Sequence, residues 1–320
     1  MSADLFDRIR AACAGVAERA EWVAIDAERL EAFARELASS PRMQASADPA
    51  QRPLGDPADT LAFVVTMDAI NFGSGWFPLL RKKPGLSGYF TIATALEERF
   101  GRLGPWDAGA LCALDARECA VVFGQEGNYA VDALMQHFAV ALNDLGELLQ
   151  AHYGGRFEAL VAAADGSAAQ LVRILTRMPL YRDVVSHAGL PVPLYKRAQL
   201  TASDLARAFG ARGPGRFRDL DRLTLFADNL VPHVLRCEGV LRYRPELARR
   251  IDAEALLEAG SQEEVEIRAV ALHAVERLVA GARAAGLDVT AAELDHRLWS
   301  RGHEPEMKAH PRHRARSVYY

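Results

Sequence analysis

A carboxylate in an apolar setting is the first feature of this chain that could do chemistry. Asp228 lies in LTLFADNLVPHVLRCEGVLRY (residues 223–243), after Leu225 and Phe226 and before Pro232, which interrupts a helical pattern. A proline there bends the helix and frees backbone groups, which indicates a need other than regular packing. A carboxylate among apolar side chains needs a donor, and the ring N–H and exocyclic amine of a guanine-like base form a matching edge. We therefore expect Asp228 to bind such a base, with Phe226 stacked on it and Leu225 alongside.

Simpler explanations exist for these residues. Asp228 could be a solvent-facing acid that stabilises a helix N-terminus, and Phe226 could simply fill the core. A second carboxylate, Asp295, lies in ELDHRLW (293–299), one helical turn before Trp299 on the same face. On its own, Asp295 is better explained as an exposed helix acid.

A basic pair is the candidate for holding an anion. Lys196 and Arg197 lie in LYKRAQL (194–200), at the start of a predicted helix. A flexible ammonium and a forked guanidinium both suit a phosphate, although a solvated basic surface explains the same residues. Of the two, we favour Lys196 as the phosphate ligand.

Two further segments supply polar and aromatic groups. Asn71 and Phe72 lie in MDAINFGSGWFP (67–78), where the following glycines permit a tight backbone near a ligand. In the segment GSQEEVEIRA, Glu264 is expected to form a capping box with the serine three residues earlier, whereas Glu266 is freer to bind a ligand amine. We include Asn71, Phe72 and Glu266 in the candidate pocket.

Helical periodicity dominates the chain and would position these residues. Apolar residues recur three and four positions apart over residues 3–19, 26–39, 129–152, 262–285 and 290–300. The alternation that is typical of a strand is scarce. We therefore predict an all-α or nearly all-α fold. Residues 1–320 are expected to form one domain of two helical lobes, and the sequence does not mark the boundary between the lobes.

Composition restricts the class of protein. The chain has 320 residues, of which 50% are hydrophobic and 25% are charged, as expected for a globular protein. No apolar run reaches the roughly 18 residues of a membrane span, and the N-terminus lacks a secretory signal, so we expect a cytoplasmic protein. The four cysteines show no CxxC spacing, which argues against a zinc site or a disulfide framework. The motifs of phosphate loops, dinucleotide-binding folds, zincins and α/β-hydrolases are absent from the sequence.

Taken together, these segments resemble the queuosine salvage family, the queuosine 5'-phosphate N-glycosylases, nearly from end to end. The resemblance rests on the order MDAINFGSGWFP, LYKRAQL, LTLFADNLVPHVLRCEGVLRY, GSQEEVEIRA, ELDHRLW and the final SVYY. It implies a compact helical fold similar to the DNA-glycosylase-like architecture, with a ligand pocket between the two lobes. One departure is the predicted loop 39–57, which has no histidine, whereas some members of the family carry a pocket histidine there.

The resemblance also implies a reaction, the hydrolysis of queuosine 5'-monophosphate to queuine and ribose 5-phosphate. In this reaction Asp295 would be the catalytic carboxylate near C1', while Asp228 would read the base and offset charge on the departing ring. Queuine is a 7-deazaguanine, so it lacks the nitrogen that ordinary purine glycosidases protonate, and the enzyme must act from the sugar side. Direct attack by water and a covalent ribosyl-aspartate are both compatible with the sequence.

The implied partner is a small-molecule substrate, either queuosine 5'-monophosphate or queuosine itself. The scheme requires no metal and no organic cofactor, and we expect no direct nucleic-acid partner and no membrane. The sequence leaves the oligomeric state open.

Two other functions stay open. The segment KPGLSGYFTIATALEE (83–98) resembles the glycine hairpin and helix with which DNA-repair glycosylases hold phosphate. A turn before a helix explains the same letters, and the net charge of −4 disfavours a DNA-binding surface. A non-catalytic carrier of queuine or its nucleotide would use the same pocket without turnover.

Overall fold

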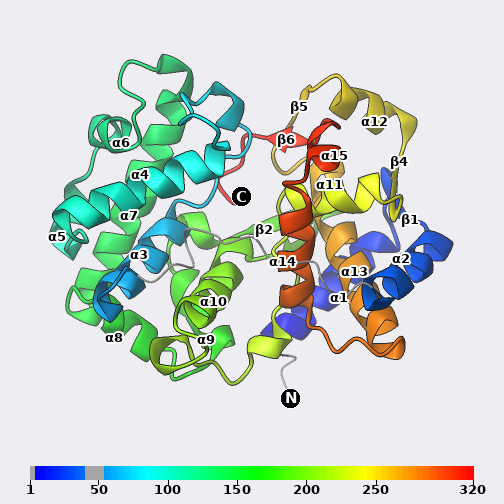
Figure 1. Cartoon of the computed structure of the whole chain (residues 1–320), viewed down its shortest axis with the longest axis horizontal. Helices are drawn as coiled ribbons and strands as arrows, with labels where there is room; N and C mark the ends of the chain where they lie inside the picture. The colour runs from blue at the N-terminus through cyan, green and yellow to red at the C-terminus, as the bar shows by residue number, and fades with distance from the viewer. Residues whose placement is uncertain (1–3, 40–53) are drawn as a thin grey trace. The chain divides into compact units, whose positions relative to one another are not determined.

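The computed structural model describes residues 4–39 and 54–320, and over these residues the chain is mostly helical with three small two-stranded sheets (Figure 1). The predicted all-α class is confirmed. Most of the predicted loop 39–57 lies outside the described residues. None of the helices within the described residues is long and apolar enough to cross a membrane.

The chain divides into two compact units. The first unit contains Met1–Ser46, Asp183–Lys196 and Asp221–Arg316, and the second contains Ala47–Arg182, Arg197–Leu220 and Ser317–Tyr320. Each unit combines segments that are distant in the sequence, which explains why no single boundary can be found by following composition along the chain.

The first unit is organised around a long helix, α13 (Gln262–Ala284), which is buried along most of its length. Its apolar residues lie on every side, so burial on several faces, and not one amphipathic stripe, holds it in place. The helices that contact it are α1 (Leu5–Ala17), α2 (Ala27–Ser39), α11 (Leu230–Cys237) and α14 (Ala291–Arg301). The unit also contains α12 (Pro245–Asp252) and α15 (Pro305–Lys308).

Short strands tie distant segments of the first unit together. The antiparallel pairs are β1 (Val23–Ile25) with β4 (Leu241–Tyr243) and β2 (Val184–His187) with β3 (Leu190–Pro193). A parallel pair joins β5 (Leu256–Leu257) to β6 (Arg314–Ala315), with Leu256 opposite Arg314. This last pair fixes the C-terminal segment of the unit.

The second unit is built around α7 (Asp132–Tyr153). Gly146 in α7 lets α5 approach closely, because a Cβ at this position would lie 2.7 Å from the carbonyl oxygen of Ala108. The helices that contact α7 are α3 (Pro57–Ala69), α5 (Ala108–Ala113), α6 (Ala116–Val122), α8 (Phe157–Ala162) and the 3-10 turn η3 (Tyr129–Val131). The other helices and 3-10 turns are η2 (Phe77–Leu79), α4 (Gly88–Leu103), α9 (Ala168–Leu175), η4 (Pro179–Tyr181), α10 (Lys196–Ala208) and η5 (Gly213–Gly215).

Candidate functional site

Asp295 is a buried carboxylate and not an exposed helix acid. It lies on α14, which begins at a closed capping box of Thr290 and Glu293. Only 6% of Asp295 is exposed, and its Oδ1 accepts a hydrogen bond from the backbone N–H of Phe226 at 3.1 Å. Burial raises the pKa of Asp295 well above its ordinary value and the charge of Asp228 adds to this, whereas the Phe226 N–H lowers it. A buried carboxyl with a raised pKa is typical of functional sites, and the catalytic role of Asp295 stays a prediction.

Asp228 lies just before α11, whose N-cap residue is Asn229. Its Oδ1 accepts hydrogen bonds from the backbone N–H groups of Leu230 at 2.7 Å and Val231 at 3.2 Å. Its Oδ2 accepts no hydrogen bond from the described residues, and the side chain is half-buried, so this oxygen is open to a ligand. Pro232 lies in the first turn of α11, where its missing N–H costs nothing, so the prediction that it interrupts a helix was wrong.

The segment before Asp228 links it to Asp295. Leu225 and Phe226 are 0% and 4% exposed, so both side chains belong to the core in this structure. The backbone of Phe226 nevertheless joins the candidate site through its hydrogen bond to Asp295. The predicted contacts of the two side chains with a ligand remain predictions.

Lys196 lies near Asp295 in the first unit. It is 5% exposed, and its positive charge lowers the pKa of Asp295. Tyr195, directly before it, has a φ of 49°, a left-handed conformation that is strained for a residue with a side chain. Asp183 stabilises this turn, because its Oδ2 accepts a hydrogen bond from Lys196 N at 3.1 Å and its carbonyl accepts from Tyr195 N at 3.2 Å.

A buried ion pair joins this turn to the segment that carries Asp228. Arg268 on α13 donates from Nη1 and Nη2 to the two carboxylate oxygens of Asp183, at 3.0 and 2.6 Å. Its Nε donates to the carbonyl of Ala227 at 2.9 Å. Sequence reasoning missed this pair, since its two positions are 85 residues apart. The carboxylate of Glu264 also lies 3.7 Å from Arg268.

Glu264 forms only half of the predicted capping box. The Ser261 hydroxyl accepts a hydrogen bond from Glu264 N at 3.4 Å, but the Glu264 carboxylate accepts from the backbone N–H of Gly260 at 3.1 Å and not from that of Ser261.

Glu266 has a structural role that the sequence did not indicate. Its Oε2 accepts hydrogen bonds from Trp22 N at 2.6 Å and Val23 N at 3.2 Å. Its Oε1 lies 3.2 Å from His187 Nε2 and 3.0 Å from Gln262 Nε2. Burial alone would raise the pKa of Glu266, but these donors lower it below its ordinary value. Both oxygens are thus engaged within the protein, and its predicted contact with a ligand stays a prediction.

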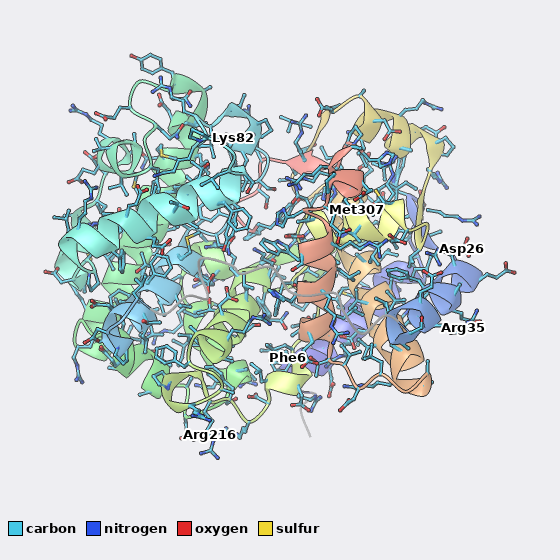
Figure 2. The ribbon with its side chains drawn as sticks, in the orientation of Figure 1. Phe6, Asp26, Arg35, Lys82, Arg216 and Met307 are labelled. Atoms are coloured by element: carbon cyan, nitrogen blue, oxygen red, sulfur yellow. The ribbon has the colours of Figure 1, made fainter. Side chains whose placement is uncertain are left out.

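Aromatic rings line α14 after Asp295. Trp299 is half-buried, stacks on His296 with ring centroids 6.4 Å apart, and meets His303 edge to face at 4.3 Å. His233 on α11 is buried, and its Nε2 lies 2.9 Å from the carbonyl oxygen of Met307 on α15. Figure 2 labels Met307 on this helix. His233 is thus a satisfied core histidine.

Asn71 and Phe72 belong to the second unit. Asn71 Nδ2 donates to Asp68 Oδ1 at 3.4 Å. Phe72 is 1% exposed, with Phe138 edge to face at 5.3 Å and the Arg197 guanidinium 4.7 Å from its ring centre. Arg197 is buried and donates to several backbone carbonyls of this unit, including that of Asp68 at 3.3 Å. This structural role agrees with the choice of Lys196 over Arg197 as the phosphate ligand, a choice that remains a prediction.

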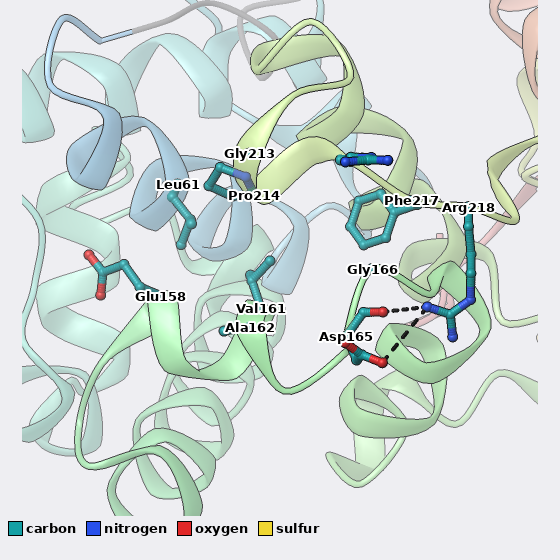
Figure 3. Close-up of a pocket in the computed structure, with 11 residues that line it drawn as sticks. Leu61, Glu158, Val161, Ala162, Asp165, Gly166, Gly213, Pro214, Phe217 and Arg218 are labelled. Carbon is teal, nitrogen blue, oxygen red and sulfur yellow. Dashed lines mark hydrogen bonds and ion pairs between the residues drawn. The ribbon is translucent and has the colours of Figure 1, made fainter.

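The second unit also has a surface cavity that contains none of the predicted site residues (Figure 3). Its volume is about 600 Å³, and at one end the Arg218 guanidinium lies 3.9 Å from the carboxylate of Asp165. Both of these side chains are exposed, so the cavity is open to solvent. Its lining residues are Leu61, Glu158, Val161, Ala162, Asp165, Gly166, Gly213, Pro214, Arg216, Phe217 and Arg218.

The chain matches known proteins over nearly its whole length. The model of the family described as queuosine salvage protein matches residues 51–320. The Queuosine 5'-phosphate N-glycosylase/hydrolase of Sphaerobacter thermophilus is 35% identical over 315 residues, which cover 95% of each chain. Proteins of the same name are 28% identical over 285 residues (84% of each chain) in Mus musculus and 34% identical over 180 residues (56% of each chain) in Dictyostelium discoideum. The chain therefore belongs to the queuosine salvage protein family.

Proposed function

We propose that this protein hydrolyses the N-ribosidic bond of queuosine 5'-monophosphate and releases queuine and ribose 5-phosphate. The observation that carries the proposal is the buried carboxylate of Asp295, which has a raised pKa and lies near the charges of Asp228 and Lys196. The relative that covers 95% of the chain is named for this substrate and this kind of reaction, which supports the same assignment.

In the proposed mechanism the bond between C1' and N9 breaks heterolytically and its electron pair passes to the base. The ionised carboxylate of Asp295 stabilises the positive charge that develops on the ribose and accepts a proton from the attacking water. The proton is then returned to the departed base, so water is the only co-reactant. Because Asp295 is buried, its charge acts through a medium of low dielectric constant and is stronger than in water.

Substrate binding is divided between two sides of this carboxylate. Asp228 Oδ2, which is open, would accept hydrogen bonds from the ring N–H and the amine of the base. Lys196, whose charge acts on Asp295, would lie on the sugar side and bind the 5'-phosphate. Trp299 is a half-buried aromatic residue on the same helix as Asp295, and its ring would contact the ligand. We further propose that the protein acts in the cytoplasm on the small molecule alone, without a nucleic-acid partner.

The test is to identify the products. Purified protein is incubated with queuosine 5'-monophosphate, and free base and ribose 5-phosphate are followed by chromatography. We expect both products in equal amounts. Ligand that raises the melting temperature without release of base would favour a carrier, and strongly salt-dependent binding of duplex DNA would favour a DNA glycosylase.

A further inference from the structure

Arg312 is a half-buried cation next to the candidate site that forms no hydrogen bond or ion pair with any described residue. The other buried arginines differ in this respect, since Arg268 donates to Asp183 and Ala227. Removing a guanidinium from water without a partner is unfavourable, so its place in the fold calls for another explanation.

The backbone around Arg312 is fixed beside Asp228. On one side, His310 N donates to the carbonyl of Met307 at 3.3 Å. On the other side, the side chain of Asn229, which follows Asp228, donates to the carbonyl of His313 at 3.3 Å. The chain then enters β6, which pairs with β5. The backbone next to Arg312 is therefore held by the side chain of the residue that follows Asp228.

Each of the two candidate carboxylates has a cation near it. The charge of Lys196 lowers the pKa of Asp295. Burial lowers the pKa of Arg312, and the charge of Asp228 opposes this effect. Together with the hydrogen bond from Asn229 to His313, this places Arg312 near Asp228, the carboxylate that is assigned to the base.

The edge of a guanine-like base presents, in order, an exocyclic amine, a ring N–H and an exocyclic carbonyl oxygen. A carboxylate can accept from the first two, and a guanidinium beside it can donate to the third. We propose that Arg312 binds this carbonyl oxygen and stabilises the negative charge that reaches it when the base departs; this rests on the proposed hydrolysis and on Asp228 as the base ligand.

The proposed reaction requires the negative charge on its leaving group to be stabilised. When C1'–N9 breaks, the electron pair is delocalised from N9 into the ring and onto the exocyclic oxygen. A 7-deazaguanine has no N7 to protonate, so a fixed cation at the oxygen is an alternative way of stabilising the leaving group. A guanidinium keeps its charge at neutral pH, so it can serve without a proton transfer.

Arg312→Gln and Arg312→Lys test the proposal, and Arg314→Gln is the matched control, since Arg314 loses the same charge but donates to the carbonyl of Glu254. For Arg312→Gln, we expect kcat on queuosine 5'-monophosphate to fall about 100-fold or more, the effect of losing one charge-stabilising donor. Arg312→Lys should recover part of this loss. Arg314→Gln should stay within about two-fold of the unaltered protein, because Arg314 is paired with Glu254 and not with a group of the candidate site.

A second measurement separates the base from the phosphate and does not need turnover. Calorimetry with free queuine should show affinity about ten-fold or more weaker for Arg312→Gln, while affinity for ribose 5-phosphate stays the same. Weaker binding of ribose 5-phosphate with unchanged binding of queuine would overturn the proposal and assign Arg312 to the phosphate. If neither kcat nor the affinity for queuine changes, Arg312 does not take part in the site. If the unaltered protein releases no base, the proposed hydrolysis fails, but the queuine titration still decides whether Arg312 binds the base.

Discussion

Removing the charge of Asp183 should be among the most destabilising single changes in this protein. Asp183 and Arg268 are 2% and 0% exposed, and Asp183→Asn would leave the guanidinium buried without its bidentate partner. Breaking a buried pair in this way costs about 3–5 kcal/mol. The carbonyl of Ala227 at 2.9 Å and the carboxylate of Glu264 at 3.7 Å remain near the guanidinium, so we expect the lower end, about 3 kcal/mol.

The change should also affect substrate binding, because Asp183 Oδ2 accepts the hydrogen bond of Lys196 N at 3.1 Å. With this turn loosened, Lys196 would be held less firmly, and we expect KM for the nucleotide to rise more than kcat falls.

Urea unfolding of Asp183→Asn, Arg268→Met and the double variant measures the effect. The double variant leaves no unpaired charge. We therefore expect its loss of unfolding free energy to be at least about 2 kcal/mol smaller than the summed losses of the two single variants. The exposed pair of Glu246 and Arg249, 3.4 Å apart, is the control, and Glu246→Gln should cost less than about 0.5 kcal/mol. Single changes that cost under about 1 kcal/mol, or strict additivity, would refute the reasoning.

Three further predictions concern the titrating groups. Since the pKa of Asp295 is raised and its ionised form is the active one, kcat/KM should rise with pH through that pKa, and Lys196→Met should move the rise to higher pH; a profile that is the same in both proteins would count against the placement of Lys196. The raised pKa of Asp295 also means that the folded state loses stability as pH rises through that pKa. In differential scanning calorimetry, Asp295→Asn should therefore melt at a higher temperature than the unaltered protein at pH 8. At pH 4 the two proteins should melt at nearly the same temperature. The pKa of Glu266 is lowered, so its stabilisation is present above the ordinary value and is lost as pH falls; Glu266→Gln should therefore cost about 2–3 kcal/mol at pH 7 in urea unfolding, with a smaller difference in acid.

Helices were predictable because their signals are local. The predicted segments 129–152, 262–285 and 290–300 correspond to α7, α13 and α14 to within three residues at each end. The small sheets were not predictable, because strands of two to four residues show no alternation and pair with segments far away in the sequence. Pro232 was misinterpreted because a proline in the first turn of a helix gives the same local pattern as one that breaks a helix.

The candidate site was predictable only in part. Asp228 stood out by its apolar neighbours, but Asp295 looked like an exposed acid, and only the family resemblance indicated it. Its burial depends on tertiary contacts such as the hydrogen bond from Phe226, 69 residues away. The ion pair of Asp183 and Arg268 gave no signal, because a pair between segments 85 residues apart leaves no spacing to detect.

The most direct measurement of the central claim compares turnover and binding in Asp295→Asn. Single-turnover release of queuine from queuosine 5'-monophosphate is followed beside calorimetric titration of the same nucleotide, with Glu293→Gln, an exposed acid on the same helix, as the control. We expect Asp295→Asn to bind the intact nucleotide but release base at least about 1,000-fold more slowly, while Glu293→Gln behaves like the unaltered protein. Release by Asp295→Asn at the rate of the unaltered protein would contradict the assignment of Asp295 as the catalytic carboxylate.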